Sequence, residues 1–287
     1  DLIMDTVSIT VNIDRYQGFL MKMDTTGTAH WGKALDYQNP SAFTTGADSI
    51  SYVTIENSVY KYDHTGALSN SKTDLNYTPK ALHVNQLNSY LLTAGISSGS
   101  IYFSALDNSL AQNFQKTYSN NFGSAKISGM DADSLGNIYI VGNVRDSISY
   151  EGQPVQEGVF FAKQDENGQL FWLKQIPNAQ TPETSLGDII TIDPGNTCMY
   201  FSGFFEEDIT PPGGTTLTPD ADGSVFLLKY DLSGTFMDSW QFDGLEKEGG
   251  DLTVDYAGNL IFSHVFRDTI QVNGTQYYSK GQLDVIT

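Results

Sequence analysis

The sequence of 287 residues predicts an all-β fold of the β-propeller class. One unit recurs along it, an apolar strand, a tight turn and a second apolar strand, and the clearest copy occupies residues 158–172. In that copy Asp165 opens the turn and Gly168 closes it, and these are residue types that a type I turn favours. Repeats of about 40–50 residues with four short strands each are typical of propellers, which have about 4–8 blades.

Copies of this unit start near residues 18, 58, 100, 158, 224 and 281, so the intervals are 40, 42, 58, 66 and 57 residues. A constant core with loop insertions of variable length explains these intervals. Six starts predict six blades of about four antiparallel strands, with seven blades as the alternative. We expect residues 1–287 to form a single domain, excised or processed from a larger secreted protein that has further domains.

A second hairpin precedes the first in each repeat, and its clearest copies occupy residues 131–142, 191–203 and 253–263. Each copy consists of a strand, a turn with Gly and Asn, and another strand. Each repeat therefore offers two hairpins, or about four short strands.

Both faces of the strand that begins at Gly158 are apolar, with Val159 and Phe161 on one face and Phe160 and Ala162 on the other. A strand in a sheet with one exposed face would alternate apolar and polar residues. A propeller blade has a neighbour on each side, so both of its faces need apolar residues. Two β-sandwich domains, the competing fold, would not predict one hairpin that repeats over the full length.

The turns of these hairpins share the spacing Asp-x-x-Gly, which predicts structural rather than catalytic roles for both residues. The residues concerned are Asp24 and Gly27, Asp63 and Gly66, Asp133 and Gly136, Asp165 and Gly168, and Asp231 and Gly234. We expect several of the glycines to have positive φ and the aspartates to accept hydrogen bonds from nearby backbone N–H groups.

The chain has 34 acidic and 15 basic residues, which gives a formal net charge of −19. The acids are spread along the chain, which indicates a uniformly acidic, soluble surface. Such a surface disfavours nucleic acid and anionic lipid as partners, because both require basic patches. No apolar run approaches the ~20 residues of a membrane helix, so we expect no membrane insertion. The single cysteine, Cys198, excludes an internal disulfide.

Two motifs resemble a family of bacterial β-propeller repeats found in secreted and surface proteins. Residues 133–142 fit its pattern Asp-x-x-Gly-Asn-Ile-Tyr-x-x-Gly, and residues 163–172 fit Lys-x-Asp-x-x-Gly-x-x-x-Trp. The resemblance covers most of the chain and is poor between residues 43 and 123, where the Trp and several Gly are missing. It implies repeats of the seven-bladed-propeller type and an extracellular or cell-surface location, and it implies no activity.

Asp220 and Asp222 are the best candidate metal ligands, because the sequence Asp220-Ala-Asp-Gly223 resembles part of a calcium loop. The loop lacks the further oxygen ligands and the acidic residue at fixed offset that such a site needs, and turn chemistry explains its Asp and Gly without a metal. The sequence contains no nucleophile motif and no phosphate-binding glycine loop. We therefore predict no catalytic residue and no cofactor other than this candidate calcium.

Three tryptophans, Trp31, Trp172 and Trp240, occupy nearly the same phase of the repeat, which favours packing between blades over a ligand platform. Arg145 and Arg267 also occupy equivalent repeat positions. Equivalent residues lie at a common radius of a propeller, so these arginines do not predict a cluster that holds one substrate carboxylate.

These observations leave two hypotheses for the function. The first is a non-enzymatic binding or scaffold module of a secreted or cell-surface protein, with an unidentified protein or glycan as its partner. The alternative is a carbohydrate-active propeller enzyme, a glycoside hydrolase or lyase, that uses carboxylates from different blades. Acids that face each other in a cleft beside an exposed aromatic residue would favour the enzyme.

Overall fold

The computed structural model describes residues 2–4, 7–9, 18–35, 40–85, 87–118, 124–181, 189–247, 250–272, 275–280 and 284–286. The predicted all-β fold is confirmed. In the described part of the chain, the strands are accompanied by a single short 3-10 helix, η1 (Ala47–Ser49).

Four antiparallel sheets contain four or five strands each. The first contains β5 (Pro40–Thr45), β6 (Ser51–Ile55), β7 (Ser58–Tyr62) and β8 (Leu68–Lys72). The second contains β9 (Thr78–Val84), β10 (Leu91–Ser97), β11 (Ser100–Leu106) and β12 (Gln112–Tyr118). The third contains β13 (Ser124–Ala132), β14 (Ile138–Tyr150), β15 (Gln153–Gln164) and β16 (Leu170–Ile176). The fourth contains β17 (Ala179–Gln180), β18 (Ile190–Ile192), β19 (Cys198–Phe205), β20 (Ser224–Asp231) and β21 (Phe236–Asp243).

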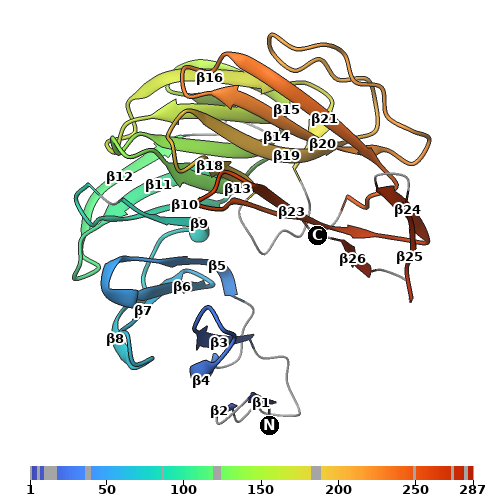
Figure 1. The fold of residues 1–287 in the computed structure, drawn as a ribbon. Helices are drawn as coiled ribbons and strands as arrows, with labels where there is room; N and C mark the ends of the chain where they lie inside the picture. The colour runs from blue at the N-terminus through green and yellow to red at the C-terminus, as the bar shows by residue number, and fades with distance from the viewer. Residues whose placement is uncertain are drawn as a thin grey trace.

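Smaller sheets lie before and after these four. β3 (Gly18–Met23) pairs with β4 (Ala29–Leu35), and β22 (Asp251–Val254) and β26 (Asp284–Ile286) both pair with β23 (Leu260–Phe266). Two ribbons are formed by β1 (Leu2–Met4) with β2 (Val7–Ile9) and by β24 (Thr269–Val272) with β25 (Thr275–Tyr278). The sheets follow one another in chain order along an arc from β3 and β4 to β23 and β26 (Figure 1). The number of blades in a closed ring stays a prediction.

The hydrophobic core is divided among the interfaces between successive sheets. Phe160 and Phe161, neighbours on β15, are both fully buried, and yet they belong to different clusters. Phe160 packs with residues of the preceding sheet such as Phe103, whereas Phe161 packs with residues of the following sheet such as Phe201. This arrangement explains why both faces of the strand are apolar.

The Asp-x-x-Gly turns are built alike. Gly27, Gly66, Gly136, Gly168 and Gly234 have φ values of 87°, 81°, 79°, 74° and 85°. In the turn between β15 and β16, Gly168 N donates to Asp165 O at 3.0 Å. The Asp165 carboxylate accepts hydrogen bonds from two further backbone N–H groups of the turn, at 2.9 and 2.8 Å. The carboxylate is therefore occupied by its own turn.

The contacts between neighbouring sheets repeat along the chain, as the sheets do. Trp31 on β4 donates from Nε1 to the carbonyl of His64 at 3.0 Å, and its ring lies against Gly66 in the turn of the next sheet. Trp172 on β16 lies in the same way against Gly234. The predicted packing between blades is confirmed for these two residues. Trp240 on β21 differs, because 38% of it is exposed.

Candidate functional site

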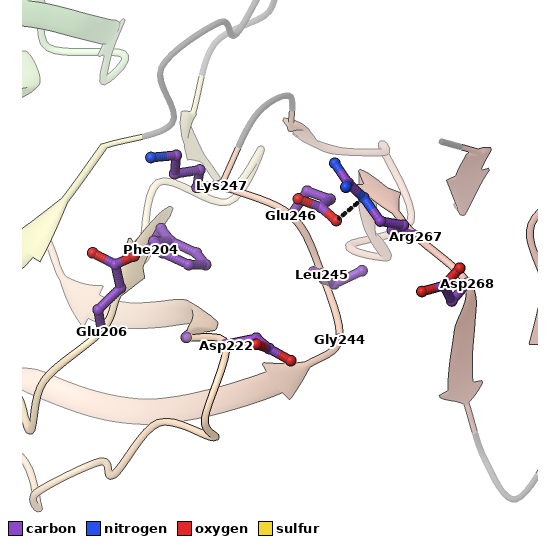
Figure 2. Close-up of a pocket in the computed structure, with 10 residues that line it drawn as sticks. Phe204, Glu206, Asp222, Gly244, Leu245, Glu246, Lys247, Arg267 and Asp268 are labelled. Carbon is purple, nitrogen blue, oxygen red and sulfur yellow. Dashed lines mark ion pairs between the residues drawn. The ribbon is translucent and has the colours of Figure 1, made fainter. Parts of the chain in front are cut away.

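A polar cleft lies between the sheet of β19–β21 and the sheet of β22, β23 and β26 (Figure 2). Its volume is about 530 Å³. The cleft opens at one end of the strands. At this end the second strand of each sheet connects to the third, and each sheet connects to the next one. Its charged residues are Glu206, Asp222, Glu246, Lys247, Arg267 and Asp268. Four carboxylates face two cationic side chains, so the cleft as a whole is acidic.

One wall of the cleft is formed by the ends of β19 and β20. Glu206 follows the last residue of β19, and Phe204 on that strand is buried. Gly223 precedes β20 with φ of 87°, and a Cβ at this position would lie 2.4 Å from the Phe204 ring. Only glycine allows the loop to approach the ring this closely, so this contact fixes the position of Asp222.

The other wall is formed by the segments that follow β21 and β23. Leu245 and Phe266 form an isolated β-bridge, and Glu246 N donates to the carbonyl of Val265 at 3.0 Å. Arg267 Nε then lies 2.9 Å from Glu246 Oε1, with 57% of the arginine side chain exposed (Figure 2). An exposed ion pair of this kind contributes about 0–1 kcal/mol to the free energy of unfolding. The pair therefore orients Arg267 more than it stabilises the fold.

Asp268 sits at the rim in a strained conformation, with φ of 58°. Its carbonyl accepts a hydrogen bond from Ser279 N at 2.8 Å, which joins the start of β24 to the end of β25 at the base of the ribbon. The equivalent residue in the third sheet, Asp146, also has a positive φ, of 76°. The Arg-Asp pair therefore changes the direction of the chain in the same way in both sheets.

Clefts recur at the same position between other sheets. One of about 410 Å³ lies between the third and fourth sheets and is lined by Asn143, Arg145 and Glu157. Glu206 lines both this cleft and the larger one, so the two clefts are adjacent. A further cleft of about 520 Å³ lies between the first and second sheets, where Tyr77 and Lys80 line it.

The predicted turn residues lie elsewhere. Neighbouring strands are antiparallel, so successive connections alternate between the two ends of the strands. The β13–β14 and β15–β16 turns therefore lie at one end of the third sheet, and the link between β14 and β15 lies at the other end. The Asp-x-x-Gly residues therefore do not line these clefts. Asp222 is the predicted candidate ligand that does, and its backbone N–H donates to Asp220 Oδ1 at 3.1 Å. The calcium hypothesis stays a prediction.

The acidic residues Glu206 and Glu246 were not singled out by the sequence. Two features of the sequence could have pointed to them. One is the Arg-Asp pair that recurs at 145–146 and 267–268, and the other is the long insertion after β19. Arg145 and Arg267 lie in different clefts, as expected from their equivalent positions.

Hydrogen bonds set the acidity of several turn aspartates. The Thr65 hydroxyl, together with the backbone N–H groups of Thr65 and Ala67, holds the pKa of Asp63 below its usual value. The pKa of Asp24 is lowered in the same way by Thr26 and Thr28. These carboxylates are thus stabilised as anions inside their turns, which does not suit them to proton transfer.

Within the described ranges no group of three or more His, Cys, Asp and Glu side chains is arranged to hold a metal ion. No helix in the same part of the chain has the length and the apolar character needed to cross a membrane.

Comparison with solved structures identifies a propeller of similar fold. The Dos1 propeller matches with a TM-score of 0.50 and 11% identity over 86% of this chain, which spans 56% of that protein's length. A luciferin-regenerating enzyme matches with a TM-score of 0.48, 14% identity and coverages of 87% and 76%. A Lactobacillus plantarum protein matches with a TM-score of 0.48, 14% identity and coverages of 78% and 64%. At such low identity the first match shows the fold alone, and the fold is a β-propeller.

No protein-family model matches the chain, and no curated protein matches it either. The specific repeat family that the motifs resemble therefore stays a prediction.

Proposed function

We propose that this β-propeller is a non-enzymatic binding module of a secreted or cell-surface protein, and that its partner is a protein or a glycan bound at the edge that carries the clefts. The observation that carries the proposal is the position of Glu206, which lines two adjacent clefts at once. The two clefts therefore offer one polar surface across three successive sheets, which suits an extended ligand better than a small molecule.

The chemistry of this surface limits the ligand. Carboxylates outnumber cations in the larger cleft, so an acidic ligand would be repelled. Hydroxyl groups of a neutral glycan can donate hydrogen bonds to Glu206 and Asp222, and basic side chains of a protein can pair with them. Arg267, held by Glu246, supplies fixed donors on the opposite wall.

The enzyme hypothesis has one observation in its favour, since acids line both walls of the cleft. Of the two acids on the far wall, Glu246 is paired with Arg267 at 2.9 Å, and Asp268 sits at the rim. A glycosidase needs a carboxyl group that is free to give its proton to the leaving group, and the ion pair occupies the Glu246 carboxylate. The binding module is therefore the better-supported function.

Binding to an array of neutral glycans and to extracellular protein extracts tests the proposal. We expect Glu206→Gln to weaken capture of the partner at least tenfold, while Asp238→Asn, an equal change of charge on an exposed part of β21, leaves capture unchanged. Equal binding by both variants would contradict the proposed surface. Cleavage of a captured glycan that is lost in Glu206→Gln would establish the enzyme instead.

A further inference from the structure

The cleft between the first and second sheets differs in charge from the other two clefts at the same end of the strands. The cleft of about 530 Å³ has four carboxylates in its lining, and the cleft of about 410 Å³ has three, from Glu157, Glu206 and Glu207. The cleft of about 520 Å³ has none, and Lys80 is the single charged residue that lines it. Of these three clefts, it is therefore the one that attracts an anion.

The difference comes from residues at equivalent positions of the repeat. Gly95 on β10 and Gly142 on β14 are equivalent, since a Cβ on them would lie only 2.2 and 2.4 Å from a carbonyl oxygen of the first strand. Ser98 and Arg145 each follow this glycine by three residues. The cleft beside the second sheet therefore has a hydroxyl group where the acidic clefts have Arg145 and Arg267.

The buried residues that line this cleft are held in place from two directions. The ring of Tyr77 stacks on the Tyr102 ring at 5.2 Å, and its hydroxyl forms a hydrogen bond with the Thr93 hydroxyl. Asn57 Nδ2 donates to the carbonyl of Leu75 at 3.2 Å, and Leu75 N donates to the carbonyl of Asn57 at 3.2 Å. The link between the two sheets is therefore fixed, and the cleft does not depend on a long loop for its shape.

The polar side chains of the cleft have unused hydrogen-bonding capacity. Among the described residues, no hydrogen bond or ion pair engages the side chains of Asn76, Thr78, Lys80, Ser97 and Ser98. By contrast, Lys72, Lys116 and Lys163 each form an ion pair with a carboxylate of the protein. One amine, three hydroxyl groups and one amide thus line a single cleft, and each can bond to a ligand.

Two acids adjoin the lining residues in the sequence without lining the cleft. Asp74 pairs with Lys72 at 2.9 Å, and Glu56 is exposed in the turn between β6 and β7. At physiological salt, exposed charges more than about 8 Å apart are largely screened. The groups in the lining therefore decide which charge the cleft accepts, although the chain as a whole is acidic.

We propose that this cleft binds a hexuronate residue of a glycan, that is, a sugar residue that carries a carboxylate. Lys80 pairs with the carboxylate, and the hydroxyl and amide groups around it bond to the hydroxyl groups of the sugar. One lysine matches the single charge of a carboxylate, and the neutral polar groups match adjacent hydroxyl groups, which a peptide terminus lacks. The volume of about 520 Å³ lies in the range of ~300–1,000 Å³ that is typical of ligand sites.

This site shares no residue with the surface around Glu206, so either proposal can fail without the other. Isothermal titration calorimetry of the intact protein tests it with two probes, trigalacturonic acid and a β-1,4-linked trisaccharide of glucuronic acid. We expect saturable binding of at least one probe with a Kd below about 1 mM. Its methyl ester, which keeps the hydroxyl groups and loses the charge, should bind about tenfold more weakly.

Variants of the protein assign the binding to this cleft. Lys80→Gln should weaken binding of the acidic trisaccharide about tenfold or more. Lys280→Gln makes the same change of charge at an exposed site outside the cleft and should leave the affinity unchanged. Asn76→Asp adds a carboxylate to the cleft at an exposed position with almost no change of shape, so it should weaken binding to a similar extent. Thermal unfolding and circular dichroism verify that each variant is folded.

Three results would each overturn the proposal: no saturable binding of either trisaccharide, equal binding of the methyl ester, or binding that is insensitive to Lys80→Gln. Acetyl-trialanine with a free carboxylate tests a peptide terminus as the source of the anion. Binding of this peptide as tight as that of the trisaccharides would overturn the assignment to a glycan.

Discussion

His264 on β23 lies opposite Ile286 at the position where two preceding sheets have Gly142 and Gly203. The imidazole is buried, and its Nε2 has no hydrogen-bond partner among the described residues. Nδ1 accepts a hydrogen bond from Val265 N at 3.0 Å, so the neutral form fits the site. Burial lowers the pKa of His264 below its usual 6.5, although a hydrogen bond with the backbone of Val265 opposes this shift.

This burial predicts a pH-dependent stability. The unfolded chain binds a proton at His264 near pH 6.5, whereas the folded chain binds it only at lower pH. The contribution of His264 to the free energy of unfolding should therefore be constant above pH 6.5. It should fall as the pH drops from 6.5 through the pKa of His264 in the folded protein. Urea unfolding from pH 7.5 to about 5 measures it. His264→Gln should remove the slope and His30→Gln, at an exposed site, should keep it.

Phe161 supplies the second prediction, because its ring connects two sheets. It lies 4.7 Å from the Phe201 ring and 4.9 Å from the Tyr230 ring, and it is fully buried. Phe161→Ala should lower the free energy of unfolding by about 3–5 kcal/mol, since it removes apolar contacts and leaves a cavity. Phe171→Ala, on the neighbouring strand but 56% exposed, should cost less than about 0.5 kcal/mol. Equal effects in chemical denaturation would contradict the assigned interface.

The turn glycines give a matched pair of variants. Gly168 and Gly258 close turns of the same kind with φ of 74° and 85°. A Cβ at Gly168 would lie 2.9 Å from Lys116 Cδ, whereas one at Gly258 would meet no atom within 4 Å. Gly168→Val should lower the free energy of unfolding by roughly 1–2 kcal/mol or more, which is the cost of a strained left-handed residue. Gly258→Val should show the strain alone, so a larger loss of melting temperature at 258 than at 168 would refute this explanation.

The sequence identified those parts of the fold that depend on local chemistry. An Asp-x-x-Gly turn is specified by four adjacent residues, and the two apolar faces of β15 follow from the continuous apolar run from Val159 to Ala162. Trp240 shows the limit of this reasoning. It follows Gly234 by six residues, whereas Trp172 follows Gly168 by four, so the same repeat phase does not place the two rings alike.

The clefts could not be predicted because their walls come from distant segments. Glu206 and Arg267 are 61 residues apart and belong to different sheets, and their approach depends on loops of variable length. The bridge between Leu245 and Phe266 and the close contact of Gly223 with Phe204 set the shape of the larger cleft. Neither contact has a local signature in the sequence. The repeat pattern predicted loop insertions of variable length, and the packing of those loops decided where polar groups gather.

The last prediction concerns the turn carboxylates and acid. Hydrogen bonds from the Thr65 hydroxyl and backbone, and from Ala67 N, lower the pKa of Asp63 from its usual 3.8 in the folded protein. The unfolded chain therefore takes up the proton first, so this contribution to stability is complete above pH 3.8 and is lost as the pH falls through the folded pKa.

Thr65→Val removes the hydroxyl donor, which lies 2.6 Å from Asp63 Oδ1, and retains the backbone donors at 2.8 and 3.1 Å. We expect the pKa of Asp63, measured by NMR titration of its carboxyl carbon, to rise toward the usual value without reaching it. The carboxyl pKa of Asp24, whose turn is intact in this variant, serves as the internal control. An unchanged Asp63 pKa in Thr65→Val would show that the backbone N–H groups alone hold the anion.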